Sequence, residues 1–428
     1  MKTHINIRFI AALVLCILIT EPIVSQTRIS SPYSRFGIGD LHLYNNTAVL
    51  AMGGTSLGLS DPLRINFSNP ASYAALEPNS FIFEAGVFSK SVRLKTETVS
   101  QTGNYTSLGH LLMGFPVTKS WKTSMGLLPY SDVGYKVVDI QSDTTLGRIR
   151  RSYEGSGGVH QVYFGNALAL GKRFSLGLNL TYLFGTLEKS RSLSFPDSMN
   201  LLNTRVLNTT DVGDFKVSAG LQYIQPLGKE FNLKAGITYS PEVTISIKDK
   251  ILAYTYIVSL TGNDIPRDTI VSTPDQQGTM RLPADIGFGI MLHKNNRWMI
   301  GADYRWQNWE NFTFFDRSDS LNNSMSISLG GQYNPASTVL SGYLKKIQYR
   351  FGARYSQTYL ELRDNRIKEF GISFGLGLPL TRTKSTINVG IEAGARGTTE
   401  NNLIKESFFK FSLGFSIYER WFEKRKYY

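Results

Sequence analysis

The sequence FSLGLNLTYLF, residues 174–184, decides the fold. Large apolar residues fill every second position, and small or polar residues fill the positions between them. The first set is Phe174, Leu176, Leu178, Leu180, Tyr182 and Phe184, and the second is Ser175, Gly177, Asn179 and Thr181. Successive side chains of a β-strand point to opposite faces of the sheet. The stretch therefore predicts a strand with one apolar face and one small, polar face.

The same alternation returns near residues 298–307, 387–396 and 409–417, where the second face carries full charges as well as glycine. Many alternating runs extend over about 14 to 20 residues, whereas strands of soluble proteins usually have about 3 to 10. A strand that crosses a membrane needs about 9 to 11 residues. The pattern predicts an all-β fold, a transmembrane antiparallel β-barrel whose strands rise above the bilayer. A secreted β-sandwich is the soluble alternative.

Turn signals divide residues 80–422 into about fourteen strands. Short basic turns alternate with longer polar loops, as in barrels with short periplasmic turns and long outer loops. The even number predicts that both termini lie on the periplasmic side of the outer membrane of a Gram-negative bacterium. The connection at 334–345 is long for a periplasmic turn. The predicted strands are 80–98, 104–118, 120–141, 150–171, 173–190, 209–228, 230–250, 277–294, 296–316, 323–335, 345–359, 364–380, 384–397 and 404–420.

Residues 1–25 are typical of a cleaved signal peptide. Lys2 and Arg8 form a basic start, and the apolar run at 9–19 is too short to span a bilayer as a helix. The only cysteine, Cys16, lies inside this run, and Leu15 before it does not suit a lipoprotein site. Removal of the signal leaves a chain without disulfides or thiol chemistry.

The rest of the composition argues against catalysis and against nucleic acid. The formal net charge of +13 is spread over strands, turns and a basic periplasmic tail at 423–428, which suits anionic lipid headgroups and the periplasm. No Ser/His/Asp arrangement is apparent, so no enzyme activity is predicted. No metal or other cofactor is expected, because the five histidines are not spaced as ligands: His4, His42, His110, His160 and His293.

Residues 26–79 have no lasting period but contain many glycines and aromatic residues. A disordered tail would be polar and poor in aromatics. The segment is therefore predicted to be packed, and the nearest cavity is the barrel lumen. We expect an N-terminal plug, or hatch, at 26–79.

At this point the chain resembles the FadL family of outer-membrane transporters for long-chain fatty acids and other hydrophobic compounds. Asn69, Pro70 and Ala71 match the Asn-Pro-Ala motif of that family's hatch, and the glycines Gly53, Gly54 and Gly58 resemble the approach to it. The resemblance implies a fourteen-stranded barrel with a hatch. A turn that anchors the plug is the purely structural alternative for the motif.

A second match lies in the third predicted strand, in the residues Gly126, Pro129, Tyr130 and Gly134. In the family, a kink in this strand opens a gap in the barrel wall. Proline has no N–H to give to a sheet, so Pro129 also predicts a bulge or broken pairing on physical grounds. The resemblance implies passive uptake, in which a hydrophobic ligand passes the hatch and leaves sideways through the gap. A bulge without a transport role is the alternative.

The lumen-facing positions carry many charged residues, which does not fit a channel lined by apolar side chains. Buried charges must be paired or hydrated, so we expect them to bond to one another or to the hatch. They include Asp303, Arg305, Arg350, Arg354, Glu392 and Arg396.

Two functions remain open from the sequence. The resemblance favours passive transport of a hydrophobic small molecule. The charged lumen, the long connection at 334–345 and the basic tail instead favour a non-enzymatic docking subunit of an outer-membrane protein assembly or secretion complex. Expected partners are outer-membrane lipid and lipopolysaccharide, with a hydrophobic ligand in the first case and an outer-membrane protein complex in the second.

Overall fold

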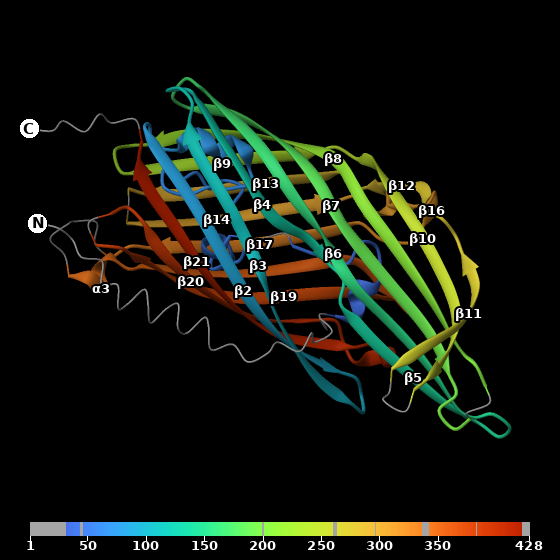
Figure 1. Cartoon of the computed structure of the whole chain (residues 1–428). Coiled ribbons are helices and arrows are strands. Elements are labelled where there is room, and N and C mark those ends of the chain that lie inside the picture. Colours follow the sequence, from blue (N-terminus) through green and yellow to red (C-terminus); the bar gives the residue numbers. More distant parts are fainter. Residues whose placement is uncertain are drawn as a thin grey trace, which may run out of the picture.

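The computed structural model describes residues 31–42, 46–198, 201–259, 263–295, 297–335, 342–381 and 383–421. They form one closed antiparallel β-barrel (Figure 1). Strand β2 (Ser80–Lys95) pairs with β3 (Ser100–Pro116) and with the last strand, β21 (Lys405–Arg420), which closes the ring. The predicted fourteen-stranded barrel is confirmed. The predicted signal peptide at 1–25, Phe422 and the basic tail at 423–428 lie outside the described residues.

Three of the fourteen wall strands are broken into two pieces. The third consists of β4 (Trp121–Asp132) and β5 (Tyr135–Asp143), the seventh of β9 (Phe231–Ser240) and β10 (Val243–Val258), and the eighth of β12 (Gln276–Leu282) and β13 (Asp285–Lys294). The unbroken strands that follow the third are β6 (Gly147–Leu170), β7 (Phe174–Ser194), β8 (Asn203–Leu227), β14 (Trp298–Gln307), β17 (Ser324–Tyr333), β18 (Gln348–Leu362), β19 (Asn365–Pro379) and β20 (Thr386–Arg396).

The breaks correct the predictions of continuous strands over 120–141, 230–250 and 277–294. Pro241 and Pro283 lie in the second and third breaks, where their missing N–H ends the ladder. The break in the third strand falls at Val133–Gly134 and not at Pro129, which remains inside β4 beside a register shift. The predicted loop at 250–277 contains a further strand, β11 (Asp264–Ser272), which pairs with β10.

The remaining elements are short. β15 (Thr313–Phe314) and β16 (Arg317–Ser318) follow η3 (Trp309–Asn311), so the predicted strand 296–316 ends early, at Gln307. α3 (Tyr343–Lys346) lies in the long connection before β18, and η4 (Glu400–Asn402) precedes β21. The N-terminal segment contains η1 (Pro32–Arg35), β1 (Asp40–Leu41), α2 (Thr47–Leu50) and η2 (Pro70–Ala75). Among the described residues no helix is both long and apolar enough to cross a membrane.

The apolar face of each strand points outward. On β7 the side chains of Leu176, Leu178 and Leu180 are 46%, 51% and 46% exposed, while Asn179 and Thr181 between them are 0% and 1% exposed. A soluble sandwich would bury the leucines and expose the asparagine. This inverted arrangement excludes the soluble alternative and defines an apolar band around the barrel that suits lipid.

The two rims of the barrel differ. Short turns at 117–120, 171–173, 228–230 and 295–297 lie at one end, the short-turn rim. At the opposite end, the long-hairpin rim, β5 to β8, β10 and β11 extend past most of the other strands (Figure 1). The hydrogen bond from Arg148 and its charge lower the pKa of Asp197 to about 2, so this ion pair between two hairpins persists at neutral pH.

Candidate functional site in the barrel interior

The N-terminal segment, residues 31–79, is bonded to strands around the whole ring. The Thr47 hydroxyl lies 2.7 Å from that of Ser412 on β21, and the Gly53 N–H donates to Ser373 on β19 at 2.8 Å. Tyr73 donates to Asn179 on β7 at 3.1 Å. All these partners belong to the face of the strands opposite the apolar band. The segment therefore contacts the inner surface of the barrel.

The three residues of the Asn-Pro-Ala motif form an anchored turn. The Asn69 side chain accepts from the Ala71 N–H at 3.1 Å, and its amide donates to the Leu57 carbonyl at 2.8 Å. Pro70 starts η2, where its missing N–H costs nothing. Asn69 and Ala71 are fully buried.

The strands below this turn carry glycines because the turn lies directly on their backbone. A Cβ atom built on Gly177 of β7 would overlap Pro70 and Ala71, and one on Gly220 of β8 would overlap the Asn69 side chain. Any other residue at these two positions would push the turn away from the wall. Glycine on the inner face of these strands is therefore a requirement of the N-terminal segment.

The three glycines predicted to belong to a hatch have two different settings. Gly53 and Gly54 have φ values of +67° and +92° and end helix α2, with N–H groups that donate to the carbonyls of Leu50 and Val49 at 3.0 Å. Gly58 has an ordinary φ and instead lies close to the backbone of Ile290.

The third strand is only partly joined to its neighbour. Pairing between β3 and β4 extends from Pro116↔Lys122 to Leu111↔Leu127 and then stops. Beyond this point β3 pairs with β2 alone, and β4 and β5 pair on their other side with β6. Gly126 lies inside the paired part, whereas Pro129 and Tyr130 lie past it and Gly134 lies in the break.

The N-terminal segment occupies the free edge of β4. Strand β1 pairs with it antiparallel, with Asp40 opposite Asp132 and Leu41 opposite Ser131. The next N–H, from His42, donates to the Tyr130 carbonyl at 2.9 Å. Further along, the N–H of Ser31 donates to the Gly134 carbonyl at 2.9 Å. Residues 31–42 thus bond to part of the edge released where β3 leaves β4, from Tyr130 to Gly134.

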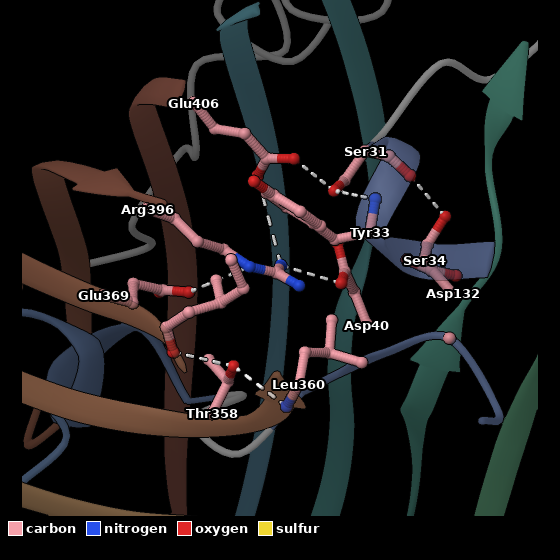
Figure 2. A network of polar contacts seen from close by, with 12 residues as sticks. Ser31, Tyr33, Ser34, Asp40, Asp132, Thr358, Leu360, Glu369, Arg396 and Glu406 are labelled. Atoms are coloured by element: carbon pink, nitrogen blue, oxygen red, sulfur yellow. Dashed lines mark hydrogen bonds and ion pairs between the residues drawn. The ribbon is translucent and has the colours of Figure 1, made fainter. Parts of the chain in front are cut away.

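A network of charged side chains holds this segment (Figure 2). Arg396 of β20 donates to Asp40 at 2.8 Å and lies 4.0 Å from Glu369 and Glu406. Ser31 donates to Glu406. Arg354 of β18 bonds to Glu392 at 2.5 Å and also to Glu369.

The other predicted lumen charges lie apart from this network. Asp303 accepts the backbone N–H groups of Ser56 and Leu57 at 2.6 and 2.8 Å, so it fixes the chain just after α2. Arg305 lies 3.7 Å from Asp285 on the neighbouring strand. Arg350 is fully buried and, among the described residues, donates to three amide oxygens.

Sequence reasoning missed the acidic partners, above all Glu84 on β2. This fully buried carboxylate accepts from the Ile65 N–H at 3.2 Å, from Ser416 at 3.1 Å and from Asn46. In the run IFEAG, Glu84 stands between the outward residues Phe83 and Ala85. This alternation could have identified Glu84 from the sequence as a charge on the inner face.

The interior of the described part of the chain contains several cavities, two of which matter here. The first, of about 150 Å³, lies between β1 and the charged network, and its lining includes Lys90, Lys410, Arg305, Tyr105 and Phe408. The second, of about 1020 Å³, opens at the short-turn rim. Among the described residues no three His, Cys, Asp or Glu side chains group as metal ligands.

Several solved structures have a similar fold. The toluene transporter TbuX of Ralstonia pickettii is 14% identical with a TM-score of 0.60, over 89% of this chain and 99% of that chain. A FadL homologue of Pseudomonas aeruginosa is 13% identical with a TM-score of 0.59, over 90% and 100%. The toluene transporter TodX of Pseudomonas putida is 17% identical with a TM-score of 0.55, over 90% and 100%. At these identities the likeness establishes the fold, an outer-membrane β-barrel of FadL type.

The sequence comparisons place the chain more narrowly. No curated protein matches this sequence. One family, described as BamG, matches residues 6–428, which is nearly the whole length. The chain belongs to the BamG family.

Proposed function

We propose that this protein is a non-enzymatic subunit of an outer-membrane protein complex, in which the barrel serves as a docking scaffold. The observation that carries the proposal is the polar interior. Residues of the N-terminal segment are bonded to the inner wall through hydrogen bonds and ion pairs, and the cavity beside β1 is lined in part by charges. A hydrophobic molecule on this path would have to desolvate those charges, which is costly. The short-turn rim would face the periplasm, and the band would meet lipid and lipopolysaccharide.

The long-hairpin rim supports docking as well. β5 pairs only with β6, and β11 pairs only with β10, so each leaves one edge outside the described sheet. Both lie beyond the apolar band yet expose branched aliphatic side chains, with Ile140 and Ile270 each 57% exposed. Unpaired edges and exposed apolar residues are the usual features of strands that add to a partner.

The test is native mass spectrometry of the tagged protein, gently extracted at its natural expression level. We expect protein partners in fixed stoichiometry and no aliphatic ligand. A lone barrel that carries a hydrophobic molecule would contradict the docking proposal.

Passive uptake of a hydrophobic small molecule is the second candidate, favoured by the lapse of pairing between β3 and β4. On this alternative a ligand would pass the hatch and leave beside Pro129 and Gly134, after residues 31–42 had withdrawn from the β4 edge. The neighbours TbuX and TodX are named as toluene transporters. Uptake of radiolabelled toluene and long-chain fatty acid by cells with and without the protein tests it. Equal uptake rates would exclude transport of these compounds.

A further inference from the structure

The larger cavity lies at the short-turn rim. Its floor is formed by Ser60 to Arg64 of the N-terminal segment, and its walls by the ends of β9, β13, β14, β17, β18 and β21. Its volume of about 1020 Å³ is at the upper end of the range for small-molecule sites, about 300 to 1,000 Å³. The cavity is therefore larger than a single small anion requires.

The floor holds an arginine with one unused donor. Arg64 is 9% exposed and bonds to Asp61 through Nε and Nη2 at 2.9 and 2.7 Å, and Nη2 also donates to Gln332 Oε1 at 3.0 Å. Its Nη1 is buried and has no hydrogen-bond partner in the described part of the chain. His293 Nε2, which lines the same cavity, is likewise buried without a hydrogen-bond partner in the described part of the chain.

A second guanidinium lies directly behind this floor. Arg350 is 0% exposed and donates to Gln332 at 2.8 Å, to Asn388 at 2.8 Å and to Gln348 at 2.5 Å. All three acceptors are neutral amides. Gln332 Oε1 is thus shared by two arginines, and no described carboxylate lies within 4.0 Å of Arg350.

Positive charge exceeds negative charge around this cavity. Lys234 lines it and donates to the Ser60 carbonyl at 2.6 Å, and no described carboxylate lies within 4.0 Å of it. The cations Arg64, Arg350 and Lys234 thus face one nearby carboxylate, Asp61. Even with Glu84, which is held elsewhere by Ile65 and Ser416, one positive charge is left over. Buried charges are normally compensated, so the floor is built for an anion.

The rim adds both charge and apolar surface. Lys346, Lys384 and Arg420 extend the basic lining, although Lys384 also bonds to Glu77. Trp298, Tyr343 and Leu380 supply apolar contacts between them.

We propose that this cavity binds an extended acidic segment of a partner protein, with a carboxylate on Arg64 and Lys234. The inference rests on the proposed function and names the chemistry of one partner.

The test uses the full chain in a non-ionic detergent and a fluorescent nonapeptide in which glutamate alternates with leucine. The matched probe has glutamine in place of every glutamate. Fluorescence anisotropy should show about tenfold tighter binding of the glutamate peptide, with affinity that falls as salt rises. The double variant Arg64→Gln/Lys234→Gln should lose about tenfold in affinity for the glutamate peptide. Lys172→Gln/Lys229→Gln, in exposed turns of the same rim, should bind like the parent.

Arg64 also braces the N-terminal segment, so a second variant separates binding from folding. Lys346→Glu changes a half-buried residue of α3 on the cavity rim, outside the N-terminal segment, and should weaken the glutamate peptide while the protease resistance of that segment stays unchanged. Equal affinity for the two peptides, or an equal loss in the Lys172/Lys229 control, would overturn the proposal. So would binding of short-chain phosphatidylglycerol or inorganic phosphate alone, because the anion would then come from lipid or solvent.

The two proposals fail in different ways. Protein partners in the native extract without peptide binding would refute the acidic-segment site and leave the docking function standing. Peptide binding by a barrel that is extracted alone would support the site and contradict the docking function.

Discussion

The carboxylate of Asp40 and the guanidinium of Arg396 lie 2.8 Å apart although 356 residues separate them in the chain. Asp40 belongs to β1, which completes the free edge of β4, and Arg396 ends β20, on the far side of β2 and β3. The pair therefore ties the segment that pairs with the β4 edge to β20, the neighbour of the strand that closes the ring.

Arg396→Met is expected to destabilise the protein by about 3 kcal/mol, because it leaves Asp40 and Glu406 buried without their cation. Denaturant unfolding in detergent, followed by tryptophan fluorescence, measures the change. Lys136→Met is the control: its pair with Glu154 is 38% and 35% exposed, so it should cost at most about 1 kcal/mol. Equal losses of unfolding free energy in the two variants would mean that the ion pair of Asp40 and Arg396 is solvated.

The pairing of β1 with β4 can be fixed covalently. Leu41 lies opposite Ser131, and directly opposed residues of an antiparallel pair have Cα atoms about 4.5 to 5.5 Å apart, within disulfide range. We expect Leu41→Cys/Ser131→Cys to form a disulfide in high yield, seen as a loss of free thiol, and to leave complex assembly unchanged. If oxidation instead blocks uptake of a hydrophobic compound and reduction restores it, residues 31–42 gate a transport path.

The glycines beneath the Asn-Pro-Ala turn give a third prediction. Gly177→Val should loosen η2 and expose the N-terminal segment to protease, because its side chain would overlap Pro70 and Ala71, at a cost of about 1 to 3 kcal/mol. The barrel itself should still resist unfolding in a gel-shift assay. Gly342→Ala, which meets nothing within 4 Å, is the control. Protease resistance equal to that of the parent would show that the turn moves without cost.

Sequence reasoning reached the barrel because the period of two is clear in long strands such as β7, and the outward Leu178 and inward Asn179 follow from it directly. Sequence reasoning failed at Pro241 and Pro283, where a proline interrupts the hydrogen bonds between strands. A run of alternating residues does not reveal which neighbouring strand those hydrogen bonds join. Sequence reasoning also named Arg396 without its partners. Asp40 is 356 residues away in the chain and meets Arg396 only in the folded barrel, whereas Glu406 lies opposite Arg396 across the hairpin of β20 and β21, a register that the alternating pattern does not define.

The edge strands of the long-hairpin rim provide the last prediction. Ile140 on β5 and Ile270 on β11 are each 57% exposed beyond the apolar band, so neither lipid nor the barrel core explains them. Ile140→Lys and Ile270→Lys should leave the melting temperature unchanged, because both side chains are already in solvent. Each should reduce the yield of co-purified partners several-fold, since a charge at a strand edge opposes pairing with a second chain. Thr144→Lys, in the exposed turn between β5 and β6 and outside both edge strands, controls for added charge. Unchanged partner yield in both isoleucine variants would remove the hairpins from the docking surface and leave the short-turn rim as the contact.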